Sequence, residues 1–271
     1  ATAMSIGRTP LCVLHSGAKD QLAMTDSSLL TAPGCLVHSD GDIKVTGAAY
    51  LQADATQSVG TATGRISPAP LTGAAQIVDP FASMAIDVPK RALLCTPLDL
   101  LYDLGLTYTL GPGVHCGNIN VRKNSVLKLL PGDHYFAKGK LSMEEGSTLT
   151  GTNVALVFDN TSDLTFKDSS KIVLEGRTAG KFSGFVIITT RANKGNFDIS
   201  SDNARKLLGT IYIPSATLLV SGLTSKVADQ SAWTVIVAKA LSISASPNLV
   251  INHNYTVGGV PVPKSVGKSR G

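Results

Sequence analysis

Aromatic residues are scarce in this chain: only 5% of its 271 residues are Phe, Trp or Tyr, with a single Trp. Positive charge is present, with a formal net charge of +5, but it is scattered. The densest basic run is the tail at Lys264, Lys268 and Arg270. Proteins that bind nucleic acids usually combine a basic face with aromatic side chains on which bases stack. We therefore expect no nucleic-acid partner.

Long apolar runs are also missing. No run approaches the ~20 residues that a transmembrane helix needs. The first ten residues lack the basic start and the apolar core of a signal peptide, and the chain does not begin with Met. We expect a mature or trimmed form, with any membrane anchor outside this chain.

The chain has four cysteines, which form no C-x-x-C pair and lie at no zinc-finger spacing from a His. An even number at wide spacing is typical of two disulfides and of an oxidising compartment. Three pairings are possible from the sequence. We favour Cys12–Cys35 and Cys95–Cys116, because each closes a loop of about 20 residues, worth roughly 3 kcal/mol on the chain-entropy model. No metal or cofactor is predicted.

Apolar residues recur instead in a short pattern, with apolar side chains at offsets 0, 2, 8 and 10. Copies that begin at Ile119, Leu141 and Leu164 are 22 and 23 residues apart. A spacing of two is that of a strand with one face inward, and a third apolar run follows each copy. Further copies consist of Ile43, Val45, Leu51 and Ala53, and of Leu241, Ile243, Leu249 and Ile251.

Three short strands in each repeat predict an all-β fold, a single-stranded right-handed parallel β-helix with about 22 residues per coil. A β-sandwich is the main rival, but it has no reason to repeat at this period. The predicted organisation is a single β-helix domain over 1–271, with an N-terminal cap and first coil at 1–42, a Pro- and Gly-rich side excursion at 54–115, regular coils at 116–256 and a tail at 257–271.

Two local expectations follow from the same pattern. The step from Leu164 to the copy at Phe197 is 33 residues, which predicts an insertion, assigned to Gly176–Gly184. The stretch Thr96–Leu106 is expected to contain a helical turn.

Several runs combine cysteine positions with turn chemistry: Pro10–Leu14, Pro33–Ser39, Pro80–Ala82, Thr109–Gly117, Leu130–Tyr135 and Gly209–Leu218. In these runs the chain resembles the C-terminal domain of TadG-like pilus-assembly proteins, and the resemblance extends over nearly the whole chain.

The resemblance implies a non-enzymatic role in the tight-adherence (Flp) pilus machinery of bacteria. It implies a location in the periplasm or at the cell surface, with an N-terminal membrane segment that this chain lacks. The expected partners are pilus-assembly proteins, pilin or cell-wall polymer, and a surface adhesin is a related alternative. The resemblance carries no catalytic residue over to this chain.

Because parallel β-helices often act on polysaccharides, a polysaccharide-binding or polysaccharide-degrading protein is the second hypothesis. General acid–base cleavage of a glycosidic bond usually needs two carboxylates about 5–9.5 Å apart. Glu145 and Asp168, at equal offsets in successive copies, are the best pair in the sequence, with Lys123 and Lys167 close by. They lie in a predicted turn with no aromatic platform beside it. We interpret them as solvated turn residues, with weak calcium binding or catalysis as the alternatives.

Overall fold

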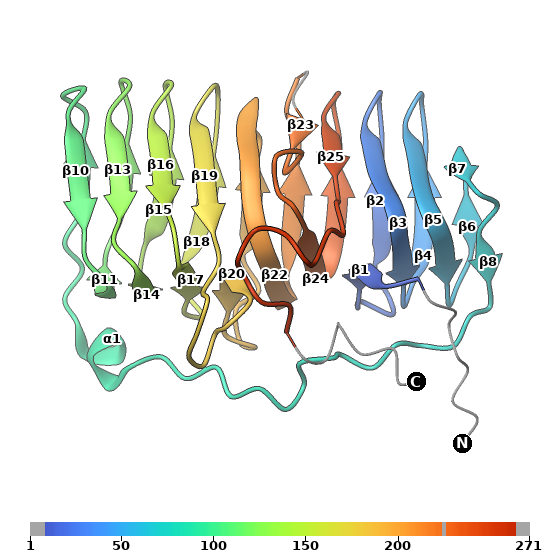
Figure 1. The fold of residues 1–271 in the computed structure, drawn as a ribbon, viewed down its shortest axis with the longest axis horizontal. Coiled ribbons are helices and arrows are strands. Elements are labelled where there is room, and N and C mark those ends of the chain that lie inside the picture. Colours follow the sequence, from blue (N-terminus) through green and yellow to red (C-terminus); the bar gives the residue numbers. More distant parts are fainter. Residues whose placement is uncertain (1–8, 224–225, 264–271) are drawn as a thin grey trace.

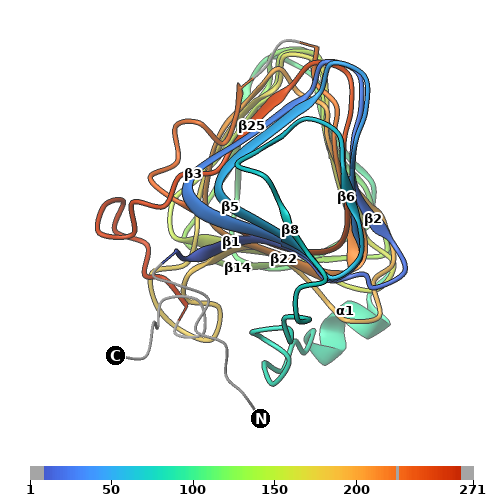
Figure 2. The ribbon, with the colours of Figure 1, turned by 90° about the vertical axis from the view of Figure 1, so that its right-hand side faces the viewer.

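The computed structural model describes residues 9–223 and 226–263. Parallel strands stack along one axis into a solenoid, which confirms the predicted all-β, single-stranded parallel β-helix (Figure 1). Viewed along this axis, the coils have a triangular outline (Figure 2). Four long strands, β3 (Leu29–Ser39), β5 (Tyr50–Ser58), β22 (Asn203–Val220) and β24 (Thr234–Ile243), bend around corners and contribute to more than one face.

Each face is a ladder of parallel strands. The first, which we call the covered face, holds β1 (Leu11–His15), β8 (Leu71–Thr72), β11 (Gly113–Cys116), β14 (Gly132–Ala137), β17 (Val154–Phe158) and β20 (Phe185–Thr189). The second face holds β2 (Gln21–Met24), β4 (Asp42–Val45), β6 (Ala62–Thr63), β9 (Leu100–Tyr102), β12 (Ile119–Val121), β15 (Lys140–Met143), β18 (Asp163–Phe166) and β21 (Asn196–Ile199). The third face holds β7 (Ile66–Ser67), β10 (Thr107–Leu110), β13 (Val126–Leu129), β16 (Thr148–Gly151), β19 (Lys171–Glu175), β23 (Lys226–Val227) and β25 (Asn248–Val250).

The register of the ladders reproduces the apolar pattern of the sequence. Ile119 pairs with Leu141, and Leu141 pairs with Leu164, so residues at the first offset of successive copies stack on one another. All three side chains are buried in one continuous core. Burying an aliphatic side chain of this size contributes roughly 1.5–3 kcal/mol, so these ladders are the main source of stability.

The order of the coils along the axis differs from their order in the sequence. β24 pairs with both β1 and β2, and β25 pairs with β3, so the last coil of the chain stacks on the first. The prediction that residues 1–42 cap an end is therefore wrong for the described residues 9–42. They form β1–β3 and the start of the next coil, which lie inside the stack between β24 and β5.

The excursion is shorter than predicted. Only residues 73–99, which we call the strap, leave the solenoid, and they run along its side from one end to the other (Figure 1). The flanking parts of 54–115 form β5–β8 and β9–β11, so the regular coils begin at Leu100 and not at residue 116. The strap contains the helix α1 (Lys90–Leu94), whereas the stretch Thr96–Leu106, where a helical turn was predicted, contains the short strand β9 and no helix. The insertion at 176–184 lies between β19 and β20, as predicted.

The middle of the covered face, which includes β17, β20 and β1, is buried on both of its sides, as continuous apolar runs such as Val154–Phe158 indicate. Its outward side chains, among them Val157 and Tyr212, form a second apolar cluster. Phe81 of the strap, Phe182 of the insertion and Val260 of the C-terminal segment complete this cluster. Residues 257–263 of the predicted tail therefore belong to the covering layer in part, and residues 264–271 lie outside the described residues.

Both predicted disulfides are present. Cys12–Cys35 joins β1 to β3 across adjacent coils, and both cysteines are fully buried. Cys95–Cys116 joins the residue after α1 to the end of β11. Their sequence separations of 23 and 21 residues match the loops expected from the sequence.

Candidate functional site: the uncapped end of the solenoid

The predicted carboxylate pair lies in an exposed corner between the second and third faces. Glu145 and Asp168 both adopt positive φ angles, 51° and 54°, as turn residues at equivalent positions of neighbouring coils. The backbone N–H of Glu145 donates to Oδ2 of Asp168 at 3.0 Å. One carboxylate thus holds the backbone of the next coil, a structural task that does not require a substrate.

The described residues contain neither a metal-binding cluster nor a transmembrane helix. Among them, no group of three or more His, Cys, Asp or Glu side chains is placed to hold a metal ion. No helix among the described residues is both long and apolar enough to cross a membrane.

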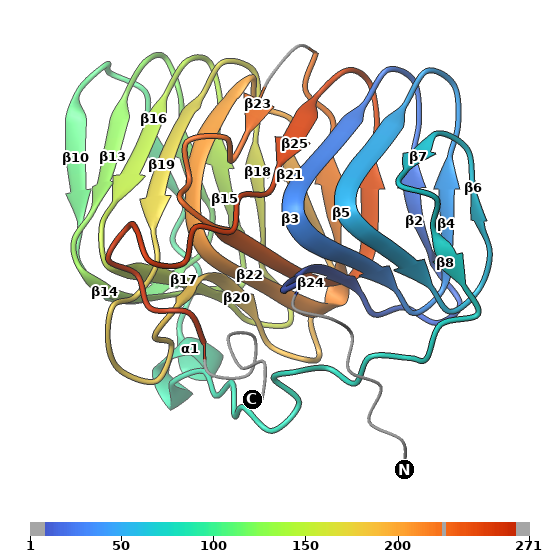
Figure 3. The same ribbon diagram turned by 45° about the vertical axis from the view of Figure 1, so that its right-hand side comes forward.

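A different feature stands out at the end of the solenoid formed by β9, β10 and β11. Each of these strands pairs with one other strand, namely β12, β13 and β14 respectively, and at the outer edge of β11 the carbonyl of Cys116 accepts a hydrogen bond from the N–H of Leu98 of the strap at 2.9 Å. No described strand pairs with their other edges, and no described segment lies across this end in the two side views (Figures 1 and 3). Open edges of this kind are a template for pairing with another chain.

Exposed leucines gather at the same end. Of the eleven exposed large apolar side chains among the described residues, six lie between positions 93 and 106. Leu94 is 83% exposed and Leu104 is 72% exposed. We call this surface the leucine end; it comprises β9–β11 and the exposed side chains of Leu93, Leu94, Leu98, Leu101, Leu104 and Leu106. These leucines lie on α1, in the strap beside it, on β9 and in the turn that follows β9, and large exposed apolar side chains of this kind indicate an interaction surface.

A hollow opens at the leucine end beside β11. Its volume is about 720 Å³, and its walls are mainly apolar, including Leu94, Leu98 and Leu100. Arg91 and His115 add polar groups at its border. The hollow is therefore suited to apolar side chains of a partner.

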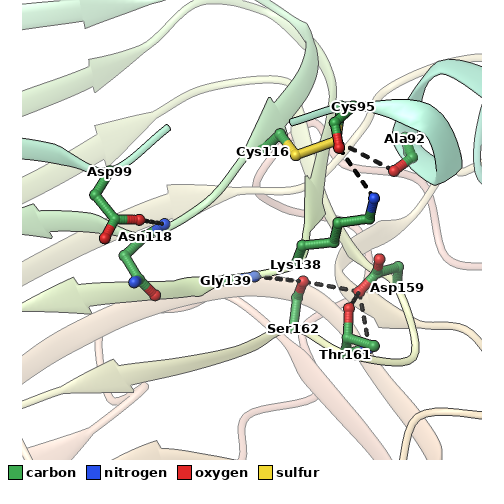
Figure 4. The surroundings of a disulfide bond; sticks show 10 residues. All are labelled: Ala92, Cys95, Asp99, Cys116, Asn118, Lys138, Gly139, Asp159, Thr161 and Ser162. Carbon is green, nitrogen blue, oxygen red and sulfur yellow. Dashed lines mark hydrogen bonds between the residues drawn. A yellow bond between two sulfur atoms is a disulfide. The ribbon is translucent and has the colours of Figure 1, made fainter. Parts of the chain in front are cut away.

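A disulfide and several hydrogen bonds fix the rim of this hollow (Figure 4). The Cys95–Cys116 bond ties the strap to β11, and the ammonium group of Lys138 donates to the carbonyl oxygen of Cys95 at 2.9 Å. The backbone N–H of Asn118 donates to Oδ1 of Asp99 at 2.9 Å, and this contact lowers the pKa of Asp99. The rim is thus held in place before any partner arrives.

Gly117 explains why the strap can approach so closely. Its φ is +99°, and a Cβ atom built on it would lie 2.6 Å from the backbone nitrogen of Leu98. Only glycine combines this conformation with this space. A larger residue would push the strap away from the chain that follows β11.

Two histidines line the interior of the coil next to the hollow. Nε2 of His134 donates to the carbonyl oxygen of Leu130 at 2.8 Å, so Nδ1 of His134 accepts the hydrogen bond from Nε2 of His115 at 3.0 Å. Burial, and then the neighbouring His134, lowers the pKa of His115 to about 4. Burial also lowers the pKa of His134. Both rings are therefore neutral near pH 7, which keeps this end of the core uncharged.

The sequence contained a signal for the leucine end that the repeat assignment missed. Leu100, Tyr102, Tyr108 and Leu110 occupy offsets 0, 2, 8 and 10 of the apolar pattern. They form the inward side of β9 and β10, and the rings of Tyr102 and Tyr108 stack with centroids 4.2 Å apart. This copy would have shown that a coil begins at residue 100.

Comparison of the chain with protein-family models, with curated proteins and with solved structures returned no match. Inference about function therefore depends on the residues and on the geometry of the chain itself.

Proposed function

We propose that the chain is a non-enzymatic structural component of a bacterial tight-adherence (Flp) pilus system and acts by binding protein outside the cytoplasm. The observation that carries the proposal is the leucine end. The run Thr109–Gly117, one of those that resemble TadG-like proteins, forms the end of β10 and all of β11 there. The resembling residues thus coincide with the surface best suited to bind a protein.

Two of the other resembling runs, Gly209–Leu218 and Pro80–Ala82, support the proposal because they meet in space. The hydroxyl of Tyr212, in the run Gly209–Leu218, donates to Asp79 at 2.6 Å, directly before Pro80–Ala82. The ring of Phe81 packs edge-on against Tyr212, with centroids 5.2 Å apart. Arg191 binds the same carboxylate and donates to the carbonyl oxygen of Phe81 at 2.6 Å. Runs more than a hundred residues apart therefore form one clamp that holds the strap on the covered face.

An extracytoplasmic location is supported by the cysteines. All four are in disulfides, and bonds of this kind persist in oxidising compartments. Together with the stacked coils, they make a stiff scaffold that presents a fixed end to a partner.

The alternative of a polysaccharide-active protein has weaker support. The single Trp of the chain, Trp233, is fully buried and is not available to stack on a sugar. Asp168 is engaged by the backbone of Glu145.

The test is deletion of the gene in the source organism, with surface pili counted by electron microscopy. We expect pili to be lost and to return with the full-length gene. A gene that carries Leu104→Asp and Leu106→Asp should fail to restore them, whereas Leu71→Asp, at an exposed leucine of the opposite end, should restore them. Immunoblots must show equal amounts of protein. Normal pili in the deletion strain would refute the proposed role.

A further inference from the structure

We infer that the leucine end binds the leucine end of a second copy of this chain, so that two solenoids join head to head in a closed dimer. This inference names the partner of the docking surface proposed above. It rests on the docking role of that surface and not on the pilus system.

The shape of the open edges selects the partner. β9, β10 and β11 lie on three different faces, so their outer edges surround the apolar core and do not share a plane. The outer edges of β9 and β10 pair with no described strand, whereas the N–H of Leu98 of the strap already binds the carbonyl of Cys116 at the end of β11. A single extended peptide can add to one edge of a sheet. The end of another solenoid presents edges on several faces around an apolar centre and can meet both open edges at once.

Hydrogen bonds show which backbone groups are available on β10. The N–H of Val126 donates to the carbonyl of Leu106, and the N–H of Leu130 donates to the carbonyl of Leu110, both at 2.9 Å. Residues of a parallel strand direct their backbone groups alternately to the two sides. Thr107 and Thr109 therefore direct their N–H and C=O groups to the free edge.

The opposite end of the solenoid is a poor match for the leucine end. We call it the blunt end; it consists of β6, β7 and β8, each of two residues. Pro68 and Pro70 interrupt the chain between β7 and β8, and proline removes a backbone donor. Short strands and prolines are devices that stop sheets from joining at their edges. Head-to-tail stacking is thereby disfavoured, and head-to-head contact remains.

Head-to-head contact is compatible with a two-fold axis perpendicular to the solenoid. Strands of the two copies then run antiparallel across the junction, and the same surface serves both copies. Part of the charge at the leucine end is paired within one copy, because the carboxylate of Asp103 lies 3.5 Å from Arg122 and 3.2 Å from Lys123. A closed pair forms, and growth stops there.

The experiment is sedimentation equilibrium of the purified chain over a wide range of concentrations. We expect a monomer–dimer equilibrium with no larger species. Leu104→Asp with Leu106→Asp should raise the dimer dissociation constant roughly 100-fold or more, because charges would enter an apolar contact. Thr109→Pro should have a similar effect by removing an N–H from the free edge without breaking a hydrogen bond to β13.

Matched controls lie at the blunt end. Leu71→Asp places the same charge on a leucine that is 51% exposed. Ala62→Pro is a proline at a free edge, because Thr61 next to it makes the bond to Ile43 of β4. Both should leave the dimer unchanged, and circular dichroism must show that all variants are folded. A monomeric wild-type chain, assemblies larger than a dimer, or a dimer that survives the leucine-end variants would overturn the inference. These outcomes are independent of any pilus count.

Discussion

The solenoid closes its sheets differently at its two ends. At the blunt end, the edge strands are two residues long and have Pro68 and Pro70 beside them. At the leucine end, the edge strands have three or four residues, and six leucines are exposed around them. The core between the ends is continuous, so the difference does not come from packing. The blunt end has short strands and prolines that hinder pairing with another chain, and the leucine end has neither. This difference supports the proposal that the leucine end binds a partner.

The largest expected effect on the free energy of unfolding comes from a matched pair of leucine truncations, one in the core and one at the leucine end. Leu149 of β16 is fully buried between the ladders of β13 and β19, whereas Leu104 is 72% exposed. We expect Leu149→Ala to lower the free energy of unfolding by roughly 2–5 kcal/mol, because it leaves a cavity. Leu104→Ala should change the free energy of unfolding of the monomer by less than about 0.5 kcal/mol.

Urea unfolding followed by circular dichroism, at concentrations where the chain is monomeric, measures both values. Repeating the measurement at high concentration sharpens the comparison, because a dimer adds stability by mass action and Leu104→Ala should then become costly. If Leu104→Ala were as damaging as Leu149→Ala in the monomer, the leucine end would be part of the fold and not a binding surface.

A smaller effect is expected from acid, through His115 at the leucine end and His15 inside the stack. Burial lowers the pKa of His115, at the leucine end, to about 4, and it lowers the pKa of His15, in the first coil, to about 4 as well. The unfolded chain takes up these protons near pH 6.5, the folded chain only near pH 4. Stability contributed by each neutral ring is therefore present above about pH 6.5 and is lost as the pH falls to about 4.

Each histidine should account for a loss on the order of 2 kcal/mol over this range. Urea unfolding of His115→Asn and His15→Asn at neutral pH and at mildly acidic pH measures the two contributions separately. Each variant should lose less stability on acidification than the wild-type chain. An unchanged loss in His115→Asn would show that the leucine end is open enough to protonate its histidine at the ordinary pKa.

Much of the fold follows from the sequence, because stacked strands repeat their apolar spacing. The period of about 22 residues, the inward positions and the insertion before β20 were all visible as spacing. The disulfides followed from loop lengths. Spacing describes one coil, however, and does not say which coils are neighbours. The pattern could not predict that the coil at β24 stacks on β1. Leu241 pairs with Leu22, but by spacing alone it could pair with any other apolar residue at the first offset.

The error over residues 1–42 has a different origin. Leu22, Met24, Leu30 and Ala32 fit the apolar pattern and form β2 and the start of β3. This copy was overlooked because residues 1–42 were assigned to a cap. The copy at Leu100 was overlooked because residues 54–115 were assigned to an excursion. The leucine end itself could not be predicted, because its exposure depends on where the strap ends and the coils restart.

The smallest expected effect concerns the corner carboxylates. Asp168 accepts the backbone N–H of Glu145, and Asp26, with a φ of 59°, accepts the backbone N–H of Ala245 at 3.0 Å across the junction of the last and first coils. The bond to Ala245 lowers the pKa of Asp26. Asp168→Ala and Asp26→Ala should each lower the urea midpoint of unfolding slightly, because each removes one hydrogen bond at the surface.

Glu145→Ala is the matched control for Asp168→Ala, since it removes the neighbouring carboxylate and keeps the backbone N–H. It should leave the urea midpoint unchanged. If the purified wild-type chain cleaved a polysaccharide and either variant abolished the cleavage, the pair would be catalytic and the non-enzymatic proposal would fail. A change in stability confined to Asp168→Ala and Asp26→Ala would instead identify both carboxylates as links between neighbouring coils. Their effects should be similar, although they lie at different positions along a solenoid whose two ends differ.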